Sequence, residues 1–102
     1  MRLALIITSL LVGSAAFANC LGEAQINTTI ASVEIMSTTK CKVQLVPTSN
    51  FQDNQLCPLD IDEVLSKGVT VGLDSNGACE FKAGENFARI LVLKADGTIV
   101  IE

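Results

Sequence analysis

The residues of this chain with the clearest chemistry are its cysteines. Cys20, Cys41, Cys57 and Cys79 stand 21, 16 and 22 positions apart. Zinc sites use cysteines in close pairs, and this spacing contains none. An even number of widely spaced cysteines is instead typical of disulfides in an exported chain. We therefore predict two disulfides and no metal site.

The strand pattern favours one of the three possible pairings. Around a turn after Thr38, opposite residues of an antiparallel pair have numbers that sum to about 77, and Cys20 and Cys57 meet this sum. Cys41 and Cys79 each share a strand face with large apolar residues, so both should point to the core. We predict Cys20 with Cys57 and Cys41 with Cys79, each contributing about 4 kcal/mol. The alternative pairs Cys20 with Cys41 and Cys57 with Cys79.

Catalytic residue types are scarce in this sequence. It has no histidine, the commonest general base and metal ligand. Ser66 and Lys67 are adjacent at a helix end and point in different directions, so they do not form a nucleophile and base. Asp60, Asp62 and Glu63 cluster where a helix begins, and we interpret them as capping residues, not as a calcium site. We expect no enzyme and no cofactor.

One polar segment is a candidate partner-binding loop. Residues 48–55 carry a single large apolar side chain, Phe51. An aromatic residue in such a loop is either an anchor for a partner or is tucked back onto the core. The candidate binding residues are Asn50, Phe51, Gln52 and Asp53.

The first residues have the layout of a secretory signal. Arg2 gives a positive start, residues 3–12 are nearly all apolar, and residues 16–18 read Ala-Phe-Ala. We expect residues 1–18 to be a signal peptide cleaved before Asn19, and residues 19–102 to form a single periplasmic or secreted domain. A lipid anchor on Cys20 is the alternative, but lipoprotein processing requires Gly or Ala where Asn19 stands.

The predicted mature domain is acidic. Without the signal it has six basic and eleven acidic side chains, a net charge of −5. It also keeps only three phenylalanines, and so has neither a basic stripe nor a stacking platform for nucleic acid. No segment of the mature chain is long and apolar enough to span a membrane. We expect the partner to be another extracytoplasmic protein.

The rest of the chain reads as strands with one short helix. Residues 23–36 alternate in hydrophobicity, and the apolar parity switches near Ala31, which indicates a β-bulge. Asp60 as N-cap with Glu63 three residues later forms a capping-box pattern, and Gly68 ends the helix. Further strands are predicted over 41–45, 69–73, 78–81, 87–94 and 98–101. The last two form a hairpin with Leu93 opposite Ile99 and Leu91 opposite Ile101.

This order of elements resembles that of small five-stranded barrels of the OB type. We predict a mainly β fold with one short helix, arranged as a five- or six-stranded barrel with OB-like strand order. A two-sheet β-sandwich is the alternative. Because fold alone does not give function, we expect only a non-enzymatic binding or structural module. The alternative function is an inhibitor of an extracytoplasmic hydrolase that presents residues 48–55.

Overall fold

The computed structural model describes residues 21–102, which are mainly β with one short helix. The predicted signal peptide, its cleavage site and Cys20 therefore lie outside the described residues. The elements are β2 (Gly22–Ile35), β3 (Lys40–Leu45), β4 (Phe51–Asp53), α2 (Ile61–Lys67), β5 (Val69–Gly72), β6 (Asn86–Leu93) and β7 (Ile99–Ile101). No helix among these residues is long and apolar enough to cross a membrane.

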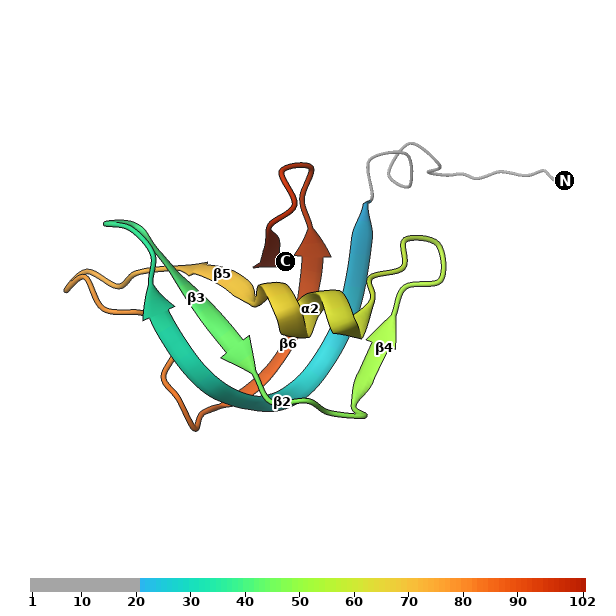
Figure 1. Ribbon diagram of the computed structural model, residues 1–102, viewed down its shortest axis with the longest axis horizontal. Coiled ribbons are helices and arrows are strands. Elements are labelled where there is room, and N and C mark those ends of the chain that lie inside the picture. Colours follow the sequence, from blue (N-terminus) through green and yellow to red (C-terminus); the bar gives the residue numbers. More distant parts are fainter. Residues whose placement is uncertain (1–20) are drawn as a thin grey trace, which may run out of the picture.

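Five of the strands form a nearly closed antiparallel barrel (Figure 1). They are hydrogen-bonded in the order β5-β3-β2-β6-β7, and β5 also contacts β7, so the sheet curls back on itself. The short strand β4 pairs with β2 outside this path. The barrel prediction is confirmed, and the sandwich alternative is wrong because one continuous sheet, not two facing sheets, surrounds the core.

The long, curled strand β2 organises the barrel, since it pairs with β3, β4 and β6. Its first half alternates as predicted, with Ala24, Ile26, Thr28 and Ile30 buried. The register with β3 shifts between Ile30 and Ser32, and this confirms the predicted bulge. The bulge bends the strand and changes which residues face inward.

The parity change has an outcome that the sequence pattern did not predict. Val33 and Ile35 lie opposite the buried Val43 and Cys41, so they are on the inner side of the sheet. Both nevertheless remain exposed, at 36% and 54%. The reason is that β6 pairs with β2 only as far as Thr29, so within residues 21–102 no strand lies beside this end of β2 on the side away from β3.

Helix α2 packs against the barrel through Val64, which is fully buried. Asp60 is its N-cap, as predicted, and its carboxylate accepts from the N–H of Asp62. The capping box is not formed, because the Glu63 carboxylate binds Lys67 Nζ at 2.7 Å instead. Lys67 Nζ also donates to the carbonyl of Gly97 and so joins the helix to the β6–β7 hairpin. The register predicted for that hairpin is confirmed.

The predicted strand over residues 78–81 is wrong. Only an isolated bridge joins Leu73 to Cys79, and the chain then leaves the sheet. Two contacts explain its path. Cys79 is bonded to Cys41, and the rings of Phe81 and Phe87 meet edge to face with their centroids 5.4 Å apart. These contacts hold Cys79 against β3 and Phe81 against β6, and after the single bridge the segment forms no further ladder.

The predicted disulfide between Cys41 and Cys79 is confirmed, with the two Cα atoms 5.8 Å apart. Both side chains are buried, as predicted, although Cys79 lies outside any strand. Cys57 is buried as well. Its predicted partner, Cys20, lies outside the described residues, so the pairing of Cys20 with Cys57 stays a prediction.

Candidate binding groove

Residues 48–55 are not the surface loop that their polarity predicted, because their centre forms strand β4. Gln52 lies opposite Gln25 of β2, and Phe51 lies opposite Ile26. Two main-chain bonds extend the pairing: the N–H of Asn27 donates to the Asn50 carbonyl at 3.0 Å, and the N–H of Asn54 donates to the Glu23 carbonyl at 2.8 Å. The physical reason is that β3 pairs with β2 only from Ile30 onwards, which leaves this earlier edge of β2 for β4.

The four candidate residues of this segment therefore have different surroundings. Phe51 is half-buried and packs against the hydrophobic core, opposite the buried Ile26. Asn50, Gln52 and Asp53 are exposed. The core contact agrees with the interpretation of Phe51 as a residue tucked onto the core. The exposed polar neighbours are the part of the segment that is available to a ligand.

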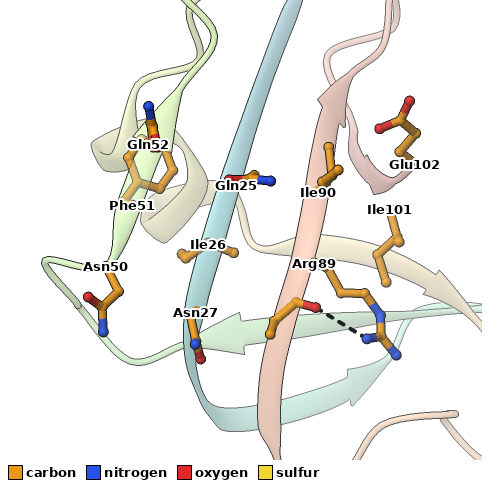
Figure 2. A pocket seen from close by; sticks show the side chains of 11 residues that line it. Gln25, Ile26, Asn27, Asn50, Phe51, Gln52, Arg89, Ile90, Ile101 and Glu102 are labelled. Atoms are coloured by element: carbon orange, nitrogen blue, oxygen red, sulfur yellow. Dashed lines mark hydrogen bonds between the residues drawn. The ribbon is translucent and has the colours of Figure 1, made fainter.

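A shallow groove of about 740 Å³ runs over the outer face of the sheet and includes part of this segment. It is lined by β2, β4 and β6 and by the end of β7. Figure 2 shows Asn50 and Gln52 on one side, Gln25 and Asn27 in the middle, and Arg89 and Ile90 on the far side. The groove therefore combines the candidate segment with two strands that are distant from it in the sequence.

The strand registers place the outward side chains of the groove in rows. In one row, Gln52, Gln25 and Ile90 are neighbours on β4, β2 and β6. Glu102 extends this row, because its N–H donates to the Ile90 carbonyl at 2.9 Å. Adjacent strands lie about 4.8 Å apart, so the side chains of one row are close neighbours.

A second row lies beside the first. Asn50 and Asn27 are neighbours through their main-chain bond, and Ala88 lies opposite Asn27 on β6. Together the two rows form a carboxamide stripe on β2 and β4, consisting of Gln25, Asn27, Asn50 and Gln52. An aliphatic stripe on β6, consisting of Ala88 and Ile90, runs alongside it.

The lining of the groove offers hydrogen-bonding groups and apolar side chains. Carboxamides both donate and accept hydrogen bonds and carry no charge. The two charged lining residues, Arg89 and Glu102, are of opposite sign. The Arg89 guanidinium lies 5.7 Å from the centroid of the Phe81 ring and donates to the Ala88 carbonyl at 3.2 Å. No histidine, cysteine, serine or lysine is among the lining residues.

The other candidate chemistry is not assembled. Within residues 21–102, no group of three or more cysteine, aspartate or glutamate side chains is placed to hold a metal ion. Asp60 and Glu63 are occupied by the helix itself, in its N-cap and its ion pair. Ser66 donates to the carbonyl of Glu63 and is thus bonded to its own helix.

Sequence reasoning missed the contribution of β2 and β6 to the groove. The outward direction of Gln25 and Asn27 follows from their strand parity, but the sequence does not show which strands flank them. The Gln25–Gln52 neighbour pair depends on a pairing between segments that are 27 positions apart.

Comparison with family models, with curated proteins and with solved structures gives no match for this chain.

Proposed function

We propose that this protein is a non-enzymatic extracytoplasmic binding module, and that the outer groove binds an extended segment of another exported protein. The observation that carries the proposal is the carboxamide stripe of Gln25, Asn27, Asn50 and Gln52, side by side with the aliphatic stripe on β6. Such a surface offers hydrogen bonds and apolar contact area together, without a net charge.

The carboxamides have unused hydrogen-bonding capacity. Within residues 21–102, none of these four side chains makes a hydrogen bond to another side chain or to the main chain, and all four are exposed. Holding exposed amides in a fixed row has no evident structural purpose in the barrel. Each amide has two donor hydrogens and an acceptor oxygen, which match the C=O and N–H groups of a peptide.

The spacing of the stripe favours a peptide ligand. Successive outward residues of a strand, such as Gln25 and Asn27, are two positions apart, about 6.6 Å. An extended peptide repeats over the same distance, so its main-chain groups can meet successive carboxamides. Its alternate side chains then reach Ala88 and Ile90 on β6. A glycan is the less favoured ligand, because the groove's one aromatic residue, Phe51, packs against the core and does not present a flat face.

The charge of the domain limits the ligand further. The predicted mature chain has a net charge of −5, which disfavours nucleic acids and anionic membrane surfaces. The groove itself contains one residue of each sign, Arg89 and Glu102. An uncharged or mixed-charge segment therefore suits it best.

Inhibition of an extracytoplasmic hydrolase remains the second candidate. An inhibitor of this kind presents a projecting loop to its enzyme. Residues 51–53 are instead paired with β2, and the N–H of Asn50 is bonded to the Thr48 hydroxyl at 3.0 Å. The segment that motivated the inhibitor hypothesis is thus part of the sheet, and we rank the binding module first.

Two finer features of the fold belong to the same proposal. We take the strand order to be OB-like, since the first barrel strand, β2, lies between the second, β3, and the fourth, β6. This likeness does not identify a ligand. We also propose the second disulfide, Cys20 with Cys57, which would fix the start of β2 and give the groove a rigid frame.

The test is a pull-down from the exported fraction, followed by identification of the captured protein and calorimetry with its purified form. The variant Gln25→Ala/Gln52→Ala removes the centre of the carboxamide stripe and should weaken binding about tenfold, as expected for two hydrogen bonds. The matched control is Gln55→Ala/Asn76→Ala, which removes two exposed carboxamides outside the groove. Equal weakening by both variants would contradict the groove assignment.

Other results of the same experiment separate the alternatives. A captured hydrolase that loses activity on binding would favour the inhibitor. Turnover of a substrate by the purified domain would overturn the non-enzymatic assignment, and binding to a neutral glycan in place of a protein would overturn the ligand class. Export is tested by intact-mass measurement. We expect a mature N-terminus at Asn19, and a lipid-modified Cys20 would contradict it.

A further inference from the structure

The end of β2 beyond its bulge is an open sheet edge that nothing in the barrel or the groove uses. We propose that this open β2 edge, residues 31–35, pairs antiparallel with the same edge of a second copy of the chain. The two barrels then share one continuous sheet, related by a two-fold axis at Val33.

The main-chain groups of Val33 and Ile35 point away from the barrel strand β3. The N–H of Met36 donates to the Lys40 carbonyl at 2.9 Å, so Met36 is bonded on the β3 side. Bonding direction alternates along a strand, which directs Val33 and Ile35 to the opposite side. There, β6 pairs only as far as Thr29. Within residues 21–102 no strand meets the N–H and C=O groups of Val33 and Ile35.

Apolar side chains are concentrated at this edge. Val33 is 36% exposed, Ile35 54% and Met36 56%. They are three of the six exposed large hydrophobic residues in the described part of the chain, and they lie within four consecutive positions. Lysine and proline are two of the devices by which soluble proteins protect such an edge, and residues 31–36 contain neither. A covering strand is therefore the expected state of this edge.

A second copy fits the edge because the sequence is complementary to itself about Val33. In this register Val33 faces Val33 of the second copy, and Ile35 faces its Ala31, so apolar side chains meet on the inner side. On the other side Glu34 faces Ser32 of the second copy, which avoids opposing charges. All the paired residues lie within β2.

The neighbouring registers are worse. A two-fold axis at Glu34 would place two carboxylates directly opposite each other, and like charges in that position are destabilising. An axis at Ile35 would require Ser37, which lies beyond the end of β2 and donates its N–H to Lys40 in the turn. In the favoured register each Glu34 keeps Lys42 of its own β3 as a cross-strand neighbour.

The same geometry limits the assembly to two copies. The open β2 edge is ended on one side by the bonds of Ile30 to Gly84 and Glu85, and on the other by the turn after Met36. Pairing with one copy therefore uses all the free main-chain groups of the open β2 edge. A two-fold contact also closes on itself, so no third copy can add. The proposal does not depend on the function of the groove, whose side chains lie on other parts of the sheet.

Sedimentation velocity of the purified protein with its disulfides formed tests the dimer. We expect a concentration-dependent dimer, and Ile35→Lys should raise its dissociation constant at least tenfold because a lysine protects the edge. The matched control is Leu56→Lys, which places the same charge at a residue that is 68% exposed outside this edge, and it should leave the dimer unchanged. Circular dichroism verifies the fold of both variants.

Cysteine crosslinking tests the register. In the proposed dimer the two Val33 Cα atoms are about 5.5 Å apart, within disulfide range, whereas the two Glu34 Cα atoms are not opposite each other. Val33→Cys should therefore form a covalent dimer on oxidation, and Glu34→Cys should not. A monomer up to millimolar concentration, an unchanged dimer in Ile35→Lys, or preferential crosslinking of Glu34→Cys would each overturn the proposal. So would a peptide of another protein that occupies the edge and excludes the second copy.

Discussion

Cys41 of strand β3 and Cys79 of the segment that follows β5 form a disulfide, with their Cα atoms 5.8 Å apart and their positions 38 apart in the sequence. The bond closes a long loop, and both side chains are buried. In the chain-entropy model such a loop contributes about 4 kcal/mol. This is a large share of the 5–15 kcal/mol of unfolding free energy that is usual for a domain.

We therefore expect Cys41→Ala/Cys79→Ala to lower the free energy of unfolding by about 4 kcal/mol. Urea denaturation followed by circular dichroism measures the change. The unsubstituted protein is measured under the same conditions without reductant. The difference in unfolding free energy then comes from this bond alone. A loss below about 1 kcal/mol would contradict the chain-entropy account and would mean that the unfolded chain is already compact without this bond.

Gly68, which ends helix α2, should not tolerate a side chain. It has a φ of 75°, in the left-handed region. A Cβ atom there would lie 2.7 Å from Gln44 Oε1 and 3.0 Å from the Val43 carbonyl oxygen. Gln44 cannot move aside without loss, because its Nε2 donates to the Leu65 carbonyl at 3.1 Å. We expect Gly68→Ala to destabilise the protein by about 3 kcal/mol.

Gly77 provides the matched control for this prediction. Its φ is 81°, but a Cβ atom would meet no other atom within 4 Å. Gly77→Ala should therefore show the cost of the backbone conformation alone, about 1 kcal/mol. Thermal or urea unfolding of both variants gives the comparison. Equal losses would show that crowding around Gly68 is relieved without cost.

The carboxyl group of Asp96 should titrate below the ordinary range. Its pKa is lowered first by the hydrogen bond from the Thr98 hydroxyl, at 2.6 Å, then by the bond from the Thr98 N–H, at 2.9 Å. The positive charge of Lys94 lowers this pKa further. Because the pKa is lower in the folded state, the stabilisation is present above the unfolded-state pKa. It is lost as the pH falls through the folded-state pKa.

Thr98→Val should raise the pKa of Asp96 part of the way to its usual value, since the main-chain donor remains. Carbon-detected NMR titration of the Asp96 carboxyl measures it. Lys94→Gln is the comparison variant. It should raise the pKa of Asp96 less, because the Lys94 charge lowers that pKa less than either hydrogen bond from Thr98 does. An unchanged pKa in Thr98→Val would contradict the assignment of the hydroxyl as the main cause.

The second disulfide is tested by peptide mapping without reduction. With Cys41 bonded to Cys79, we expect a peptide that joins Cys20 to Cys57. Cys57 is buried beside the start of β2, where its carbonyl accepts from the N–H of Glu23 at 2.8 Å. A peptide joining Cys20 to Cys41 would contradict both this pairing and the structure.

The amino-acid sequence by itself determined the features that depend on near neighbours in the chain. Alternation in residues 23–36 gave the buried face of β2 and its bulge, because side-chain direction in a strand has a period of two. Asp60 and Gly68 marked the ends of the helix. The Asp60 side chain caps a free N–H of the first turn, and Gly68 adopts the positive φ that ends the last turn. The expected inward direction of Cys41 and Cys79 also led to the prediction of their bond, which is present although residues 78–81 do not form a strand.

Tertiary structure decided what depends on distant neighbours. The polarity of residues 48–55 indicated a loop, but the vacant edge of β2 made their centre a strand. Glu63 had two available partners, and it binds Lys67 rather than the cap. The groove could not be predicted for the same reason. Gln25, Gln52 and Ile90 become neighbours only when three distant strands are placed in register, and hydrogen-bond pairing between strands, unlike side-chain alternation, leaves no periodic signal in the sequence.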